Sequence, residues 1–117
     1  MTIDHVSFSV PPSEYAKVVA WYLAALAPLG YTKQFDFPNQ TCGLGDSPQD
    51  AKLWIAQSEE ASTSGKVHLA FRVNDHATVD KCYAEGVKAG GSSNGEPGVR
   101  EIYHPNYYAA FVFDPVG

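Results

Sequence analysis

The sequence predicts an α+β fold built from two successive copies of a strand–helix–three-strand unit. His5 and His68 mark the copies, because each lies near the start of a stretch in which apolar residues alternate with polar or small ones. A period of two is typical of a half-buried strand. The two histidines are 63 residues apart. Gly30 and Gly90, which follow the two predicted helices, are 60 residues apart. This similar spacing supports a duplication.

The first copy covers about residues 1–57 and begins with a strand over residues 2–10. In this strand Val6 and Phe8 share one face, while His5 lies on the other and less apolar face. We predict that Ser13 caps a helix that ends near Leu26, because serine is a favoured N-cap residue. Three more strands are predicted, at residues 31–37, 41–44 and 51–57.

The second copy covers about residues 66–117 and follows a polar linker at 58–65. We predict a strand over 67–73 and a helix that Asp75 caps and that ends at Ala89. A glycine-rich loop and two further strands complete the copy, at residues 92–98, 99–103 and 107–113. Asp114, Pro115 and Gly117 form a type I turn signal. The last strand of this copy is missing or truncated, so strand 107–113 is expected to lack a hairpin partner. Either the sequence is cut short here, or another chain or element covers this edge.

Composition narrows the classes of function. The 117 residues suit one domain, and the net charge of −5 with scattered lysines and arginines argues against nucleic acid as a partner. No apolar run is long enough for a membrane span, and no signal-peptide pattern is present. Cys42 and Cys82 lack a CxxC spacing, so we expect reduced thiols and a cytoplasmic protein. Seven Tyr, six Phe and two Trp favour a pocket for an organic ligand.

Several motifs resemble the vicinal oxygen chelate superfamily, which includes glyoxalase I, bleomycin and fosfomycin resistance proteins and extradiol dioxygenases. They are Asp4-His5-Val6, Trp21-Tyr22, Leu29-Gly30-Tyr31, Val67-His68-Leu69-Ala70-Phe71, and the segment 103–111 that leads into Asp114-Pro115-Val116-Gly117. The resemblance covers essentially the whole chain. It implies a single glyoxalase-like domain over residues 1–117, in which two tandem βαβββ modules form a cupped mixed sheet, and a homodimer.

The resemblance also implies a metal site. In the family each module supplies ligands to one divalent metal, and the matching residues here are His5 and His68. We expect the two imidazoles to converge and to bind iron, manganese, zinc or nickel. However, the family's glutamate after the Asp-Pro-x-Gly turn has no counterpart up to residue 117, and strand 51–57 has no carboxylate. A metal-free polar cavity around the two histidines is therefore an open alternative.

Five other residues have two interpretations each. His104 is a catalytic acid or base, or a loop residue, and Tyr108 orients a ligand oxygen or is an ordinary sheet aromatic. Arg72 shares the predicted face of His68, so it pairs with an anionic substrate or faces solvent. Trp54 lines the substrate pocket or fills the core. Glu101 is a substitute metal ligand or a surface carboxylate.

Two main functions follow. The first is a metal-dependent lyase, isomerase or dioxygenase that acts on a small oxygenated organic molecule chelated at the two histidines. The second is a metal-free protein that binds or sequesters a small planar molecule, as bleomycin resistance proteins do. A structural subunit that uses its open sheet edge for assembly is a third option. The expected partners are a small molecule and a second copy of the chain, with no nucleic acid and no membrane.

Overall fold

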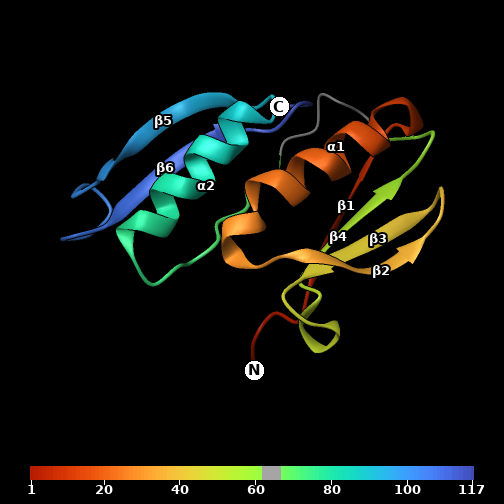
Figure 1. The fold of residues 1–117 in the computed structure, drawn as a ribbon, viewed down its shortest axis with the longest axis horizontal. Coiled ribbons are helices and arrows are strands. Elements are labelled where there is room, and N and C mark those ends of the chain that lie inside the picture. Colours follow the sequence, from red (N-terminus) through yellow and green to blue (C-terminus); the bar gives the residue numbers. More distant parts are fainter. Residues whose placement is uncertain (62–66) are drawn as a thin grey trace.

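The computed structural model describes residues 1–61 and 67–117, and it confirms the α+β class. The strands form two sheets rather than one. Sheet A has four strands in the order β1-β4-β3-β2, and sheet B has two, β5 and β6. Figure 1 shows the two main helices, α1 and α2, side by side in the middle of the molecule. None of the helices in the described part of the chain is long and apolar enough to cross a bilayer.

The first module has the predicted order of elements. Strand β1 pairs with β4 in parallel, and β3 pairs with both β4 and β2 in antiparallel fashion. Two short 3₁₀ helices lie in the connections after the first helix and before the last strand. The elements are β1 (Val6–Val10), α1 (Pro12–Ala25), η1 (Ala27–Leu29), β2 (Thr32–Phe37), β3 (Thr41–Gly45), η2 (Pro48–Asp50) and β4 (Leu53–Gln57).

The main core lies between sheet A and α1. Leu44, Leu53 and Ile55 are fully buried, and Val18 of α1 packs into the same cluster. Full burial of each such side chain stabilises the fold by about 1.5–3 kcal/mol. Because side chains alternate along a strand, residues between these positions point to the helix-free face of sheet A. Trp54 therefore lies outside this core, although its size also suited a core position.

The two helices begin differently. Helix α1 starts at Pro12, so Ser13 is not its N-cap, and the preceding Pro11 occupies that position without a side-chain cap. Proline suits the first helical position because its missing N–H has no helical partner and its φ is already helical. Helix α2 (His76–Lys88) is capped as predicted, since the Thr78 N–H donates to the Asp75 carboxylate over 2.7 Å.

The second module differs most from the prediction at its late strands. Strand β5 (Ser92–Val99) forms over the residues expected to loop, and residues 101–103, expected in a strand, lie in a turn. Strand β5 pairs with β6 (Tyr108–Phe113), so β6 does have a hairpin partner on one side. The glycines of β5 led to the prediction of a loop, because glycine has a low strand propensity. The register shifts near Gly95 and Gly98 show where the pairing accommodates them.

Residues 67–73 do not form the predicted strand. Their side chains follow the predicted alternation, because Leu69 and Phe71 pack against the main core and the Phe71 ring lies 5.9 Å from that of Tyr31. In the first module β1 pairs only with β4. The second module has no counterpart of β4 among its described residues, so the backbone of 67–73 lacks the ladder that would make it a strand. Residues 62–65 of the predicted linker lie outside the described residues.

The two helices join the modules. The Trp21 indole N–H of α1 donates to the Gly86 carbonyl of α2 over 2.8 Å, in a buried position. A Cβ on Gly86 would lie 3.3 Å from the Trp21 ring, so glycine allows this close approach. Helix α2 packs in turn against sheet B, where Val112 of β6 lies near Gly86. The order is therefore sheet A, α1, α2, sheet B, and each helix-free face lies away from the helix pair (Figure 1).

The predicted turn at the end of the chain is confirmed, and it also contacts α1. The Gly117 N–H donates to the Asp114 carbonyl, and the Val116 N–H donates to the Asp114 carboxylate. The other carboxylate oxygen accepts a hydrogen bond of 2.6 Å from the Tyr22 hydroxyl. This bond ties the end of sheet B to the helix that covers sheet A.

Replacing Tyr22 with phenylalanine is expected to lower the free energy of unfolding by about 1.5–3 kcal/mol, because a hydrogen bond to a carboxylate is lost. Burial first, and the Asp114 hydrogen bond second, raise the pKa of Tyr22 above its ordinary 10.0. As the pH rises the unfolded chain therefore releases this proton first. The hydrogen bond of Tyr22 therefore makes its full contribution to the free energy of unfolding below about pH 10. This contribution is lost progressively as the pH rises above that value.

Urea denaturation of the wild type and of Tyr22→Phe between about pH 7 and pH 11 measures this difference. A Tyr83→Phe variant on the half-buried side of α2 is a suitable control, since Tyr83 forms no hydrogen bond to a carboxylate among the described residues. A difference between wild type and Tyr22→Phe that stays constant over the whole pH range would contradict the proposed contribution.

Candidate functional site

Three aromatic rings gather on the helix-free face of sheet A. Trp54 of β4 stacks on Phe35 of β2 with 5.5 Å between ring centroids and 18° between planes. Its distance to Phe37 is 6.4 Å, again with nearly parallel planes. Phe35 and Phe37 remain 39% and 51% exposed. The three rings, which we call the aromatic platform, thus form an apolar surface that water contacts.

A glycine in the middle of the sheet makes the platform possible. Gly43 of β3 lies directly between Phe35 and Trp54 in the register of the three strands. A Cβ at this position would lie 2.7 Å from two atoms of the Trp54 ring, which is closer than real contacts allow. The indole therefore lies over the bare backbone of β3. Glycine inside a strand often marks such a close approach.

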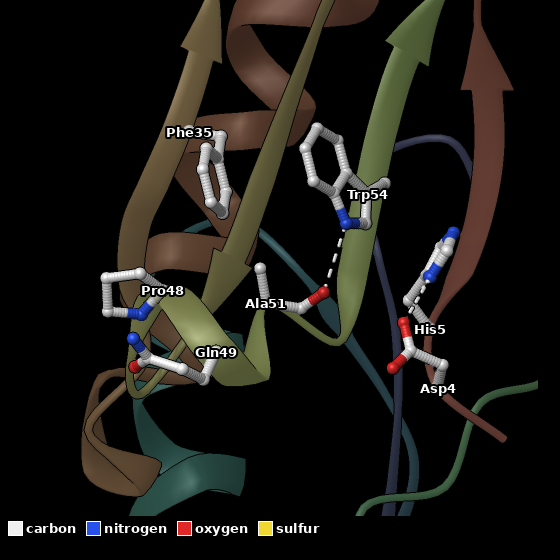
Figure 2. Close-up of a pocket in the computed structure, with 7 residues that line it drawn as sticks. All are labelled: Asp4, His5, Phe35, Pro48, Gln49, Ala51 and Trp54. Carbon is white, nitrogen blue, oxygen red and sulfur yellow. Dashed lines mark hydrogen bonds and ion pairs between the residues drawn. The ribbon is translucent and has the colours of Figure 1, made fainter.

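Two rings of the platform, Phe35 and Trp54, form one wall of a cavity of about 370 Å³. The Trp54 indole N–H donates to the Ala51 carbonyl over 3.0 Å, which fixes the ring against the segment before β4. Figure 2 shows this bond and the residues that face the cavity. The lining residues are Asp4, His5, Phe35, Pro48, Gln49, Ala51 and Trp54.

His5 lies just before β1 at the edge of this cavity, with its ring 6.3 Å from that of Trp54. Its side chain is 52% exposed, and its Nδ1 atom lies 2.8 Å from the Asp4 carboxylate. This hydrogen bond holds the pKa of Asp4 below its ordinary value. When Nδ1 carries the proton, Nε2 of the neutral ring is the acceptor nitrogen. His5 can therefore accept a hydrogen bond from a ligand, or donate one when protonated.

His68 lies in a different place. It is exposed, and its ring neighbour is Phe111 of β6, 6.3 Å away. Phe111 lies on the helix-free face of sheet B, because Tyr108 and Val112, of the opposite parity along β6, face α2. Each histidine thus belongs to the outer face of its own sheet. The expected convergence of the two imidazoles within one chain is not observed, because the helix pair lies between the sheets.

The family resemblance implies a metal, so the metal-binding side chains that the structure brings together are decisive. Among the described residues, no three His, Cys, Asp or Glu side chains form a group that could hold a metal ion. Catalytic zinc sites use three protein ligands, and two separate histidines do not supply them. The described residues of one chain therefore do not fit a catalytic metal, and we derive no chemistry through one.

The two predicted pocket residues lie in two cavities. Trp54 lines the cavity at the aromatic platform, whereas Arg72 lines a second cavity of about 490 Å³ near η1 and the start of α2. Tyr31 and Asp46 are among the other walls of this second cavity. Arg72 is exposed there and does not reach the first cavity.

The two predicted catalytic residues line neither cavity. His104 lies in the exposed turn between β5 and β6, where its ring contacts Tyr107 and its Nδ1 lies 3.1 Å from the Pro105 carbonyl. The Tyr108 hydroxyl donates to the Asp80 carboxylate of α2 over 2.6 Å, and this bond raises the pKa of Tyr108. Glu101 lies in the same exposed turn as His104, so its predicted place on a strand is wrong. The structure gives these residues a structural or surface setting.

The residues that the sequence interpretation missed are Phe35, Phe37 and Gly43. A signal for them was present: the alternation Phe35-Asp36-Phe37 puts both rings on one face of a strand, and Gly43 interrupts the next strand. Their meeting with Trp54 depends on the register of β2, β3 and β4, which alternation alone does not give.

Comparison with solved structures identifies the fold. A glyoxalase/bleomycin resistance protein from Albidiferax ferrireducens T118 matches with a TM-score of 0.76 and 21% identity, over 97% of this chain and 90% of that chain. A glyoxalase/bleomycin resistance protein/dioxygenase family enzyme from Burkholderia phytofirmans PsJN matches with a TM-score of 0.66 and 17% identity, over 98% and 91%. No protein-family model and no curated protein matches the sequence. The chain has the fold that the resemblance to the vicinal oxygen chelate superfamily implied.

Replacing Gly43 with alanine is expected to displace the Trp54 ring, because the new methyl group would overlap it. We expect a changed near-ultraviolet circular dichroism signal from Trp54 and a loss of about 1–3 kcal/mol in the free energy of unfolding. Gly98→Ala is the matched control, since a Cβ there would have its nearest neighbour 4.0 Å away. An unchanged tryptophan signal in Gly43→Ala would show that the ring does not lie over β3.

Proposed function

We propose that this chain, which has the fold of the glyoxalase/bleomycin resistance/dioxygenase proteins, binds a planar aromatic small molecule on the helix-free face of sheet A. The observation that supports this most is the aromatic platform, whose two phenylalanine rings remain substantially exposed. A planar ligand that covers Phe35 and Trp54 would remove their apolar surface from water and add ring stacking. A cavity of about 370 Å³ suits a molecule of a few fused rings.

The polar residues of the cavity favour a neutral or cationic ligand. Among the described residues that line it, Asp4 is the only carboxylate, and none is a lysine or an arginine. His5 and Gln49 can exchange hydrogen bonds with ring substituents, which would fix the orientation of the ligand. A positive charge on the ligand would also interact favourably with the face of the Trp54 indole.

Binding explains the site better than metal-dependent catalysis does. A lyase, isomerase or dioxygenase that chelates its substrate on a metal needs a donor set that the described residues of one chain do not bring together. Stacking on the platform needs no metal and uses residues that are already in place. The Albidiferax protein is described as a glyoxalase/bleomycin resistance protein, and bleomycin resistance is compatible with small-molecule binding.

Fluorescence titration tests the proposal with neutral, cationic and anionic compounds of the naphthalene, quinoline and acridine type. Trp54 and Trp21 are the two tryptophans, and Trp21 is buried between the helices, so a stacked ligand should quench Trp54 selectively. We expect saturable quenching by neutral or cationic members of the series. Trp54→Ala should weaken binding, measured by calorimetry, about tenfold or more, because stacking and ring burial are lost.

Phe113→Ala is the matched control, because Phe113 is an exposed ring of sheet B and lies outside the cavity. This variant should bind as the wild type does. Equal loss of affinity in Trp54→Ala and Phe113→Ala, or no saturable binding of any compound, would contradict the proposal. Preference for the anionic compounds would contradict the role of Asp4.

A further inference from the structure

One asparagine of the chain, Asn94, directly precedes a glycine, Gly95. Between two strands this dipeptide is the usual signal for a tight hairpin turn. The structure places it inside β5 instead, at a point where the register shifts. Ser93 pairs with Val112, and Gly95 pairs with Phe111, the neighbouring residue of β6. Asn94 is therefore the extra residue of a β-bulge, and such a residue is left unpaired.

The bulge leaves the Asn94 side chain and the following amide accessible. Asn94 is exposed. The Gly95 N–H donates to the Ser93 hydroxyl of the same strand over 3.3 Å, which is longer than a typical N–H···O bond. Gly95 has no side chain, and its φ of +150° is a conformation that favours glycine. The Gly95 nitrogen is thus weakly hydrogen-bonded and lies one residue after an exposed carboxamide.

A cation lies beside this amide. The Arg100 side chain folds back along β5, where its Nη2 atom donates to the Glu96 carbonyl over 2.6 Å. A Cβ on Gly95 would lie 2.9 Å from Nη2, so the guanidinium is next to the Gly95 backbone. A nearby positive charge favours the deprotonated form of an acid. Arg100 therefore stabilises negative charge on the Gly95 nitrogen, and on an oxygen that gains charge beside it.

We propose that Asn94 is a modification site, where the chain deamidates spontaneously through the backbone amide of Gly95 with electrostatic help from Arg100. The Gly95 nitrogen loses its proton and forms a bond to the side-chain carbonyl carbon of Asn94. The C–N bond of the side-chain amide breaks, and ammonia leaves with the proton. Water then opens the cyclic imide at either of its carbonyl carbons, which gives aspartate or isoaspartate.

The modification changes sheet B alone. Each product adds one negative charge to β5, and isoaspartate also adds a methylene group to the backbone of the bulge. Sheet B lies on the other side of the helix pair from the aromatic platform (Figure 1). Deamidation therefore stands or falls independently of ligand binding at the platform.

The other asparagines of the chain are internal controls. Asn39, Asn74 and Asn106 are also exposed, but each precedes a residue that has a side chain. A side chain on the following residue hinders closure of the imide ring, whereas glycine leaves the approach open. We therefore expect Asn94 to react and these three residues to remain unchanged over the same time.

Peptide mapping by mass spectrometry tests the proposal on the full chain, incubated at mildly alkaline pH with and without urea. Fragmentation of the peptides separates aspartate from isoaspartate. We expect Asn94 to convert in the folded chain at a rate within about threefold of the rate in urea, because the bulge opens at little cost in free energy.

Variants of Arg100 test the electrostatic help. Arg100→Gln should slow the conversion in the folded chain about threefold or more, and should leave the rate in urea unchanged, because the guanidinium is held near Gly95 only by the fold. Arg100→Lys keeps the positive charge and should restore most of the rate. Circular dichroism spectra like that of the wild type would confirm that both variants are folded.

Three results would overturn the proposal. Conversion of Asn94 in urea but not in the folded chain would show that the strand protects the site. Conversion of Asn74 or Asn106 as fast as that of Asn94 would show that exposure, rather than Gly95, selects the residue. Equal rates in the folded wild type and in folded Arg100→Gln would contradict the role of Arg100.

Discussion

The contact between Trp21 and Gly86 determines the layout of the whole molecule. Because Gly86 has no side chain, the Trp21 indole approaches the backbone of α2 and donates a buried hydrogen bond to it. The two helices consequently pack on each other, and each also covers one sheet. A larger residue at position 86 would have to push the helices apart, which typically costs about 1–3 kcal/mol. The helix pair therefore keeps the two helix-free faces separate within one chain.

This separation changes how the two histidines are interpreted. The duplication predicts that His5 and His68 have equivalent places in their modules, each on the less apolar face of its segment. It does not predict how the modules pack, and that packing decides whether equivalent residues meet. His5 joins the aromatic platform, and His68 joins Phe111 on the other sheet. The platform thus works as a stacking surface with a histidine at its edge, rather than as half of a metal site.

Much of the fold could be predicted from local signals. The order of elements in the first module, the Asp75 cap and the turn at Asp114 each depend on neighbouring residues, and each is confirmed. Features that depend on pairing with a strand distant in the sequence could not be predicted from local signals. Residues 67–73 have the side-chain pattern of a strand but no ladder, whereas the glycine-rich residues 92–98 form one because β6 pairs with them. Strand identity depends on pairing as well as on propensity.

In the candidate site, too, local signals predicted some features, whereas long-range pairing of strands decided the others. Alternation placed His5 on the less apolar face of its strand and left Trp54 with two interpretations. The register of the strands then brought Phe35 and Phe37 to Trp54, and the fold left His104 and Tyr108 outside both cavities. Register depends on long-range pairing, which one sequence does not reveal. The homodimer and the cytoplasmic location stay predictions.

Nuclear magnetic resonance of the imidazole and indole signals, recorded while a planar aromatic ligand is added to the monomeric chain, tests the central claim most directly. If the aromatic platform is a separate site, the signals of the His5 imidazole and the Trp54 indole N–H shift together and saturate, while those of the His68 imidazole stay unchanged. A joint, saturating shift of His5 and His68 in the monomer would mean that the two faces form one site, and it would contradict the layout described above.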